Sequence, residues 1–347
     1  MSESKSSSRP GMPQWYRDLA AFQKGEWGQA IGQIANTVLP YLVLFVFGIY
    51  TVEAGWPYWA TLLVCIPACF FLIRTFIIFH DCTHGSFVPS AKGNRVIGFI
   101  TGALALTPFE SWRLSHLKHH ATNGQLDHRG FGDVWTMTFE EFRDAPRWKR
   151  IWYRIYRNPF FMFVLGPLFT FVISQRFSDL GKGGRVRRSV LAVNAFIAVV
   201  AIGVWLIASF KTYILVQLPI IMISGTMGIW LFYVQHQFDP GYWARDGEWN
   251  KLDAALHGSS YYKLPPVLRW FTGNIGIPHL HHLRPAIPNY RLRKAYNATP
   301  EVQEPKPLTF WESIKSVRIN LWHEAEQRFL SFRQAARLMR GRGNMAV

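Results

Sequence analysis

Residues 58–84 read YWATLLVCIPACFFLIRTFIIFHDCTH, an apolar run that ends in two histidines four positions apart. As a helix, the run from Tyr58 to Phe79 is long enough to cross a hydrocarbon core, which takes about 20 residues. His80 and His84 follow directly, and residues at positions i and i+4 share one face of a helix. The stretch therefore predicts a membrane-spanning helix that brings a pair of possible metal ligands to the membrane surface.

Three further apolar runs approach the same length. The four predicted spans are Ala35–Tyr50, Tyr58–Phe79, Ser189–Phe210 and Tyr213–Tyr233. Two other runs are shorter: Phe160–Ser174 is interrupted by a Gly-Pro pair, and Val96–Leu106 stops before Pro108. We expect neither to cross, although the second can dip into the membrane and return. The pattern predicts an all-α, polytopic membrane protein with four transmembrane helices.

The charge of the chain fits a membrane protein better than a nucleic-acid-binding one. Lys and Arg number 38 against 21 Asp and Glu, which gives a net charge of +17. The basic residues stand in loops beside the apolar runs, as the positive-inside rule describes, and no nucleic-acid module is visible. Three cysteines lie in or near spans without C-x-x-C spacing, and we expect them to be reduced packing residues. The composition therefore argues against nucleic acid as a partner.

Nine of the 12 histidines fall into clusters with the spacing of metal ligands. Two of the nine are the pair at the end of the second span. Three more stand at positions i, i+3 and i+4 after that span, one directly follows the last span, and three lie near residue 280 on a predicted short helix or loop. The candidate ligands are His80, His84, His116, His119, His120, His236, His279, His281 and His282. One zinc takes only three or four protein ligands, so this number predicts two ions. His128, His257 and His323 have no partner at such a spacing, and we expect them to lie elsewhere.

Counting the crossings predicts on which side the histidines lie. With a cytoplasmic N-terminus, the second span returns the chain to the cytoplasm at His80. If Phe160–Ser174 crossed, the basic loop after it would lie outside, against the charge rule, and His236 would emerge on the wrong side. With four full crossings, every histidine cluster is cytoplasmic. The sequence thus predicts a cytoplasmic helical cap that carries the metal site.

Two other functions were weighed on these residues. A zinc metalloprotease has His-Glu-x-x-His on a helix, but Asp81 occupies the position of the glutamate, and one zinc leaves most histidines without a role. A membrane metal carrier or sensor places its polar ligands inside the bundle, whereas these histidines stand at the ends of spans. An enzyme with two metal ions explains the pattern better. In this interpretation Asp81 is an acceptor that orients a ligand imidazole from the second shell.

The chain resembles the membrane-bound fatty acid desaturases, and most of all the acyl-lipid desaturases of the omega-6 or delta-12 kind. His80-Asp-Cys-Thr-His84-Gly-Ser is similar to their first histidine box, and His116-Leu-Lys-His119-His120 to their second. Tyr-Val-Gln before His236 is similar to the stretch with their additional ligand. His281-His282-Leu, followed by Ile-Pro-Asn-Tyr-Arg-Leu, is similar to the third box and its flank. The matching residues extend from His80 to Leu292, most of the chain.

The third box departs from the family pattern. It normally reads H-x-x-H-H, and its first histidine falls on Pro278, whose side chain cannot bind a metal. We expect either that His279 replaces the missing ligand or that one metal ion keeps an open position. The departure puts full activity in doubt.

The resemblance implies the chemistry. Its members use a non-haem di-iron site and O2 to insert a cis double bond into a fatty acyl chain, here predicted to belong to an acyl lipid. The sequence shows neither a fused cytochrome domain nor a flavin fingerprint, so the resemblance implies a separate ferredoxin or cytochrome-type electron donor. Residues 70–79 and 229–233 are candidates for an apolar substrate tunnel. A di-iron hydroxylase, a monooxygenase or a carotenoid ketolase on the same scaffold stays the alternative.

The chain divides into three predicted segments. Residues 1–30 form a polar tail and interfacial segment without the apolar core of a signal peptide. Residues 31–300 form the membrane desaturase domain with its cytoplasmic di-iron site. Residues 301–347 form a basic amphipathic segment, with one helix over Trp311–Arg340 that either rests on lipid head groups or packs on the cap. We expect a multi-pass protein of a bacterial inner membrane.

Overall fold

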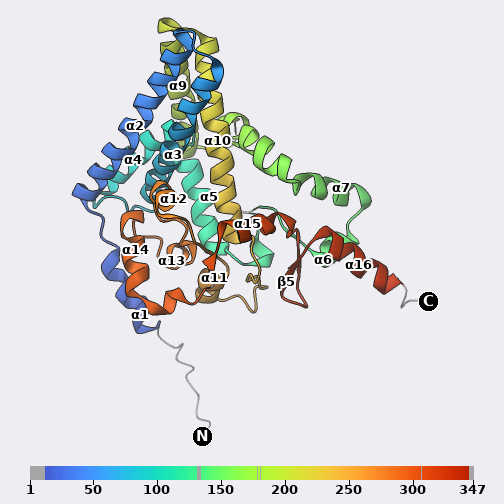
Figure 1. Ribbon diagram of the computed structural model, residues 1–347. Coiled ribbons are helices and arrows are strands. Elements are labelled where there is room, and N and C mark those ends of the chain that lie inside the picture. The colour runs from blue at the N-terminus through green and yellow to red at the C-terminus, as the bar shows by residue number, and fades with distance from the viewer. Residues whose placement is uncertain (1–11, 131–133, 178, 180, 306, 344–347) are drawn as a thin grey trace.

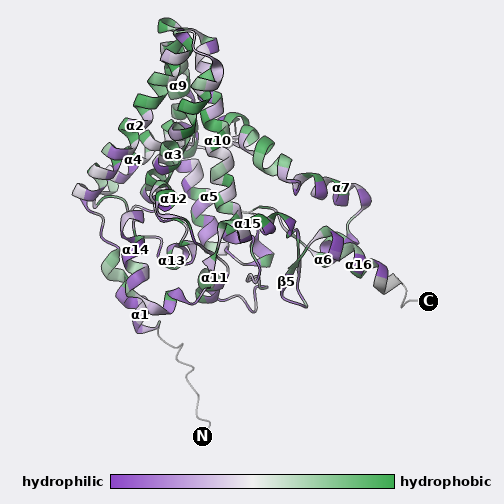
Figure 2. Cartoon of the chain, in the orientation of Figure 1, coloured by the Kyte–Doolittle hydropathy of each residue, from purple (hydrophilic) through white to green (hydrophobic). Residues whose placement is uncertain are grey.

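Four long helices form two antiparallel hairpins in the computed structural model, which describes residues 12–130, 134–177, 179, 181–305 and 307–343. They are α2 (Trp27–Glu53), α3 (Tyr58–Thr83), α9 (Gly184–Ile207) and α10 (Phe210–His236). Each is long and apolar enough to cross a membrane, which confirms the four predicted spans. Figure 2 shows that hydrophobic residues cover their upper parts, whereas polar residues dominate the lower part of the molecule.

The tips of the two hairpins meet at one end of the bundle. Gly55 takes a left-handed backbone conformation, with φ of 72°, in the short turn between α2 and α3. Ser209 caps α10 by accepting a hydrogen bond from the Thr212 amide, and Thr212 in turn bonds to Glu53 of the first hairpin. Tyr58 donates to the carbonyl of Leu215 at 3.0 Å. Because the tips coincide, α3 and α10 must both end at the opposite side, where their histidines stand (Figure 1).

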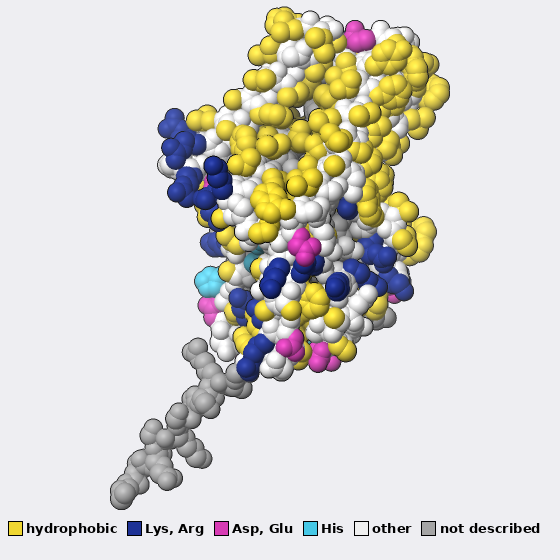
Figure 3. All heavy atoms as spheres, turned by 90° about the vertical axis from the view of Figure 1, so that its left-hand side faces the viewer, with side chains coloured by type: hydrophobic (Ala, Val, Ile, Leu, Met, Phe, Trp, Pro, Cys, Tyr) yellow, Lys and Arg dark blue, Asp and Glu magenta, His cyan; other side chains and the backbone are white. Residues whose placement is uncertain are grey.

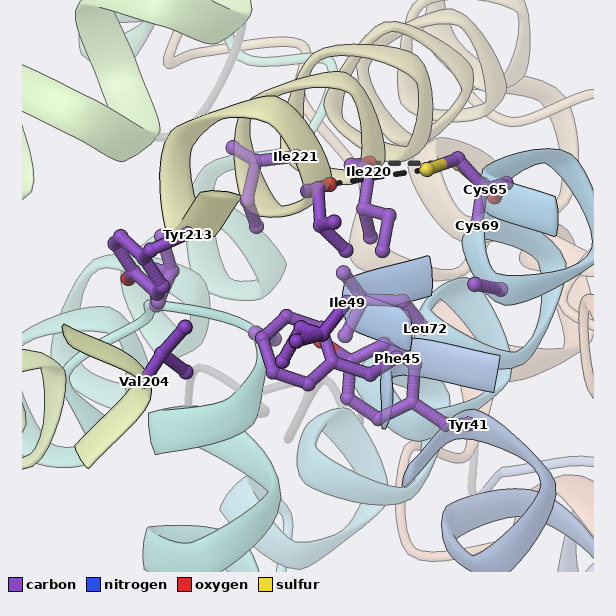
Figure 4. Close-up of a cluster of buried hydrophobic side chains, with 14 residues drawn as sticks. Tyr41, Phe45, Ile49, Cys65, Cys69, Leu72, Val204, Tyr213, Ile220 and Ile221 are labelled. Carbon is purple, nitrogen blue, oxygen red and sulfur yellow. Dashed lines mark hydrogen bonds between the residues drawn. The ribbon is translucent and has the colours of Figure 1, made fainter. Parts of the chain in front are cut away.

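Between the hairpins lies an apolar core made by α2, α3 and α10. Figure 4 shows Tyr41, Phe45 and Leu72 facing Ile220. Gly48 allows close approach, since a Cβ there would lie 3.0 Å from a methyl group of Val216. All three cysteines are free and buried, in agreement with the expected packing role.

The run near Val96 forms a helical hairpin that enters the bundle and returns. Its helices, α4 (Ala91–Leu104) and α5 (Phe109–Thr122), have 14 residues each, about 21 Å, which is too short to cross. The turn between them reaches the core, because Ala105 and Leu106 pack against the cluster of Figure 4. Two glycines of α4 permit this fit: a Cβ at Gly98 would overlap the ring of Phe109, and one at Gly102 the ring of Phe79.

The apolar run near residue 160 belongs to a bent arm, which we define as residues 147–177. It begins with α7 (Arg147–Tyr156), bends by 63°, and continues as two π-helical turns, η3 (Phe161–Leu165) and η4 (Leu168–Ser174), and the short α8 (Gln175–Phe177). In Figure 1 the arm slopes away from α10 down to α7. The bend fits the expectation that Phe160–Ser174 is no independent crossing.

The remaining elements form a cap below the spans. The helices of the cap are α1 (Gln14–Asp18), η1 (Leu19–Phe22), η2 (Leu126–His128), α6 (Phe139–Asp144), α11 (Lys251–His257), α12 (Pro266–Phe271), α13 (Pro278–Leu283), α14 (Asn289–Ala298), η5 (Pro300–Gln303), α15 (Phe310–Lys315), η6 (Ser316–Arg318) and α16 (Phe332–Gly343). Its strands are β1 (Met137–Thr138), β2 (Tyr261–Tyr262), β3 (Pro307–Leu308), β4 (Leu321–His323) and β5 (Arg328–Leu330). They pair in the orders β1-β4-β5 and β2-β3. Within the described residues, the regular secondary structure is thus helical apart from five very short strands.

The prediction of one helix over Trp311–Arg340 is wrong. The segment instead contains α15, η6, the antiparallel pair β4 and β5, and the start of α16. Leu321, Trp322 and Leu330 are fully buried there, and β4 pairs with β1 of the cap. Burial of these side chains against the cap overrides the amphipathic pattern, because hydrophobic contacts outweigh helix propensity.

One buried arginine ties the C-terminal segment to α10 and to the arm. Arg157 directly follows α7 and is 2 % exposed. Its guanidinium donates to the carbonyls of Trp135 and Ile319, to the side-chain oxygens of Thr136 and Gln237, and to the hydroxyl of Tyr233, at 2.7–3.3 Å. Tyr233 passes the link on by donating to the Ser316 carbonyl at 2.7 Å. A planar group with several donors suits this position.

We expect Arg157→Lys to destabilise the protein, because a compact ammonium cannot reach all these acceptors and leaves buried carbonyls without donors. Each such group costs about 1–3 kcal/mol. The unfolding temperature in detergent should fall by at least about 5 °C. Arg147→Lys, at an exposed position, is the control and should leave it unchanged. An equal unfolding temperature for both variants would contradict the role of Arg157.

Candidate metal centre

Four elements bring their histidines to the same place below the spans. His80 lies in the last turn of α3 and His84 caps that helix. His116, His119 and His120 lie in the second half of α5, and His236 is the last residue of α10. The six-residue helix α13 supplies His281 and His282. The helix α13 begins with Pro278, whose fixed φ suits the first position of a helix.

The rings form two adjacent groups. The five-histidine group consists of His80, His84, His116, His120 and His281, and the three-histidine group of His119, His236 and His282. Within each group, one ligand nitrogen per residue lies within 4.8 Å of all the others. The two groups touch, since the rings of His120 and His282 stack at 4.2 Å between centroids.

Consecutive histidines are divided between the groups. His119 and His120 go to different groups, and so do His281 and His282. The cause is the helix itself, in which neighbouring side chains point about 100° apart. Each His-His pair therefore gives one ligand to each group and fixes their separation. The repeated His-His of the sequence thus places the two groups side by side.

The nitrogen contacts in the five-histidine group match ligands of one ion. The Nε2 atoms of His84 and His116 lie 3.0 Å apart, and His120 Nε2 lies 3.1 Å from those of both His116 and His281. Two ligands at right angles, each about 2.1 Å from a metal, also lie about 3.0 Å apart. Hydrogen bonds alone explain the set poorly, because the single hydrogen on His120 Nε2 can point at only one of two neighbours.

The three-histidine group is a compact triangle. Its ring centroids are 4.7 Å apart for His119 and His236, and 4.9 Å for each pair that includes His282. The Nδ1 atom of His236 lies 3.3 Å from the carbonyl oxygen of Gly258. That contact favours hydrogen on Nδ1 and leaves Nε2 as the ligand atom.

Burial keeps five of these imidazoles uncharged. It lowers the pKa of His84, His116, His120, His281 and His282 well below the usual value, and the neighbouring imidazoles lower each pKa further. The neutral ring is the form that binds metals. Neither group contains a carboxylate or a thiol among the described residues. A purely imidazole donor set fits iron, zinc, copper or nickel and does not suit calcium or magnesium.

Asp81 contacts a ligand imidazole, as the sequence predicted. Its Oδ1 lies 3.1 Å from Nδ1 of His80. Its Oδ2 accepts hydrogen bonds from both the backbone and the side-chain amide of Asn289, at 2.6 and 2.8 Å. Asn289 in turn accepts from Gln33 of α2 at 3.0 Å. This buried chain fixes the orientation of the His80 ring and joins α2, α3 and α14.

Apart from Asp81, sequence reasoning missed the residues that hold the imidazole rings in place without being histidines themselves. Asn289 stood in a motif flank without an assigned role, and Gln33 lies two residues before the predicted span Ala35–Tyr50. The carbonyl of Gly258 has no side-chain signal at all. The sequence offered no cue to any of the three, since each contact depends on how different elements pack together.

His279 lies apart from both groups, so its predicted role as a substitute ligand is corrected. Its Nε2 lies 2.9 Å from the carbonyl of Val302, and its ring sits between those of Tyr261 and Tyr296. Burial lowers the pKa of His279 to about 4. On α13 it is two residues from His281 and points to the opposite side of the helix. The structure therefore brings eight of the nine candidate histidines together.

The three remaining histidines lie outside both groups, as expected. His128 and His323 have other contacts: His128 lies 3.5 Å from Asp246, and His323 stacks on Phe139. His257 is the last residue of α11 and belongs to neither group.

An apolar cavity of about 340 Å³ leads from the histidines into the bundle. Its walls are formed by α3 (Leu72, Ile73, Phe76, Ile77), α5 (Trp112, Ser115), α10 (Ile221, Ser224, Gly225, Gly228, Ile229, Leu231, Phe232) and the arm (Tyr156, Thr170, Phe171, Gln175). The two segments predicted to line the substrate tunnel, residues 70–79 and 229–233, thus each supply some of the residues that line the cavity. Phe70 instead packs on Phe271, and Tyr233 turns towards Ser316.

Comparison with known proteins agrees with this arrangement. The sequence model of the family "Fatty acid desaturase" matches residues 54–313, about three quarters of the chain. The chain belongs to the fatty acid desaturase family. A fatty acid desaturase of Bacillus subtilis is 41% identical over 317 residues, which are 91% of this chain and 90% of the relative. This membrane protein is therefore an oxidoreductase that desaturates fatty acids.

More distant relatives carry more specific names. An sn-1 oleoyl-lipid 12-desaturase of Synechocystis sp. is 26% identical over 285 residues, covering 79% of this chain and 76% of the relative. An sn-1 acyl-lipid omega-3 desaturase (ferredoxin) of the same organism is 27% identical over 238 residues, covering 64% of this chain and 62% of the relative.

A pair of substitutions two residues apart tests the set of ligands. We expect His281→Ala to lose about half of the bound metal, because it removes one member of the five-histidine group. His279→Ala should keep the full amount, since His279 bonds to a backbone carbonyl outside both groups. The measurement is metal per chain by mass spectrometry after purification, with size-exclusion chromatography as the check on folding. Loss of metal from a correctly folded His279→Ala protein would restore His279 as a ligand.

Proposed function

We propose that this protein is an O2-dependent desaturase of acyl lipids, which inserts a cis double bond at a pair of non-haem iron ions. One observation carries the proposal: two adjacent groups of imidazoles, which share two His-His pairs, lie at the end of an apolar cavity. The five-histidine group would hold one iron and the three-histidine group the other. This assignment excludes His279. The first histidine of the family's third box falls on Pro278 in this chain, and no other histidine takes its place.

The choice of iron follows from the reaction. Removing hydrogen from an unactivated methylene needs a stronger oxidant than acid or base catalysis by side chains provides. Two iron ions, when bound, would supply it by activating O2. The balance requires one O2, two electrons and two protons for each pair of hydrogens taken from the chain, and the products are a double bond and two waters. Imidazole is a suitable donor for iron.

The protein's own residues position the substrate and exclude water. The cavity has apolar walls where it meets the rings, with Trp112 stacked on His116 at 4.2 Å and Phe232 beside both His119 and His236 at 5.0 Å. An acyl chain held there has adjacent carbons fixed next to both groups. The contacts of Asp81 with His80, and of the Gly258 carbonyl with His236, hold two ligand rings in place.

An acyl lipid is the proposed substrate, because one relative is named for an sn-1 oleoyl lipid and another for an sn-1 acyl lipid. One of them is also named for ferredoxin. We propose a small ferredoxin or cytochrome-type protein as the electron donor, and the net charge of +17 favours an acidic one. The proposed location is a bacterial inner membrane, with the histidines facing the cytoplasm.

Product analysis tests the reaction. We expect a bacterial host that expresses the protein to accumulate a new cis-unsaturated fatty acid, at least tenfold above a host with His119→Ala. The product should fail to form without O2. Gas chromatography with mass spectrometry of total fatty acids measures both. Hydroxylated or keto products in its place would support the alternative di-iron oxygenase, and unchanged lipids with retained metal would favour a metal carrier.

Labelling of single cysteines tests the orientation. Ala54 lies exposed at a hairpin tip, and Gly247 lies exposed in the cap with open space around it. The native cysteines are buried. We expect a membrane-impermeant maleimide to modify Ala54→Cys in spheroplasts and Gly247→Cys only in inside-out vesicles. The reverse pattern would place the histidines outside the cell.

A further inference from the structure

The side wall of the cavity is formed by the arm as well as by the four spans. Thr170 and Phe171 of η4 line it from one side, opposite Gly228 of α10. Arm and span meet at Gly225, where a Cβ would lie 2.9 Å from Cβ of Pro167 and 3.0 Å from the ring of Phe171. We call this contact of Pro167 and Phe171 with Gly225 the seam. It is a junction of side chains rather than a continuous helix wall.

The surface of the arm that faces away from the spans is apolar and exposed. The exposed residues there are Val164, Leu165, Phe169, Val172 and Ile173. Their opposite side packs inward, with Met162 and Phe163 buried. In a membrane protein such a surface lies against lipid tails. The seam therefore separates the cavity from the hydrocarbon of the bilayer by little more than the ring of Phe171.

The helix α7, at the other end of the arm, has the surface pattern of a helix that lies at the level of the lipid head groups. On α7, Trp148, Ile151 and Trp152 share one face and are 69%, 49% and 57% exposed. The opposite side of the helix carries Arg150 and Arg154. A helix with tryptophan on one side and arginine on the other lies in the interface of a bilayer and attracts phosphate. Figure 2 shows α7 as largely hydrophilic below the hydrophobic spans, and Figure 3 shows Lys and Arg below the apolar spans on another face of the molecule, the left-hand side of Figure 1.

The cavity runs along α10, which crosses the membrane. Its lining residues extend on this helix from Phe232 back to Ile221, about 16 Å of helix. That length is close to the depth of hydrocarbon in one leaflet, about 15 Å. The cavity is thus aligned with the tails of the surrounding lipids and has a similar length.

The winding of the arm also differs from an ordinary helix. Both η3 and η4 are π-helical, and Gly166 and Pro167 separate them. Such wider turns occur mostly at functional sites, and kinks form at glycine and proline. The break between α7 and η3, with its bend of 63°, gives the arm a second joint. A segment with two joints can swing as a unit without unfolding.

We propose that the seam is a lateral entrance, through which an acyl chain of a bilayer phospholipid passes sideways between η4 and α10. The ring of Phe171 moves aside, the chain takes the place of that contact, and the phosphate stays at the basic face of α7. The chain never leaves an apolar environment, since it passes from the bilayer into the cavity. What happens to it there rests on the proposed function, whereas entry through the seam does not.

A disulfide across the seam tests this entrance. The separation of the Cβ atoms in a Pro167→Cys, Gly225→Cys protein lies within about 1 Å of disulfide geometry. The purified protein is placed in vesicles of phosphatidylglycerol and phosphatidylethanolamine that contain a phosphatidylglycerol with a diazirine on its acyl chain. Photolabelling of the peptide around Gly228 and Phe232 is then read by mass spectrometry. Oxidised glutathione closes the disulfide and dithiothreitol opens it.

We expect closure to reduce labelling of the cavity at least tenfold, and reduction to restore it. The matched control is Thr51→Cys, Thr61→Cys, whose native hydroxyls lie 2.9 Å apart in the buried contact at the distant hairpin tip. Its disulfide should leave labelling unchanged. Full labelling of the cavity in a protein with a closed seam overturns the proposal and places the entrance elsewhere, for example at the aqueous face of the cap.

A second variant asks the same question without a cross-link. Phe171→Ala removes the ring that closes the seam, so the rate of cavity labelling should rise at least threefold. An unchanged or lower rate contradicts the proposal. Both readouts concern entry of the chain and need no turnover. Absence of an unsaturated product together with a labelled cavity would count against the proposed function alone.

Discussion

The metal centre depends on two helices that are longer than the bilayer they cross. A span needs about 20 residues, but α3 has 26 and α10 has 27. The surplus of six or seven residues, about 10 Å, carries His80 and His236 beyond the hydrocarbon. An imidazole cluster inside the hydrocarbon would need partners for every polar atom. Because both hairpins have their tips at the same end, the additional residues of α3 and α10 extend to the same side. The shorter helices α5 and α13 supply the remaining histidines of the two groups.

The geometry of a helix also explains how two groups form so close together without merging. Each His-His pair serves both groups, so the distance between them is set by the backbone of α5 and α13 rather than by flexible side chains. Outside the rings, Asp81, Asn289 and the Gly258 carbonyl hold two of the ligands from different elements. A substitution in this outer layer disturbs the metal groups without touching a ligand. The closely packed rings have little freedom to find another arrangement.

The sequence predicted the features that local spacing determines and missed those that depend on packing at long range. Apolar length identified the four spans, and helical spacing grouped the histidines of residues 80–84 and of residues 116–120. His236 was identified by its position directly after a span. The prediction for His279 was wrong, because its distance of two and three residues from His281 and His282 says nothing about which side of α13 faces the other histidines. Sequence reasoning also predicted a helix for the segment after Trp311. Local spacing cannot reveal that β4 pairs with β1, because the paired residues are about 180 positions apart. Asn289 had no signal of its own, as its role exists only once α14 lies against α3.

A polar metal centre and an apolar substrate impose opposite demands, and the arm is where the fold reconciles them. Exposing an acyl chain of 16 methylenes to water costs about 13 kcal/mol at about 0.8 kcal/mol for each methylene. A route through the aqueous cap would raise the barrier to entry by a large part of that amount. Displacing one half-buried ring, Phe171, from its contact with Gly225 exposes apolar surface only to lipid, which costs far less. The bilayer side is thus the low-barrier approach to a cavity whose other end must remain polar enough to hold metal. The bend between α7 and η3 serves the same division, because it lets one segment lie along the head groups and the next enter the hydrocarbon.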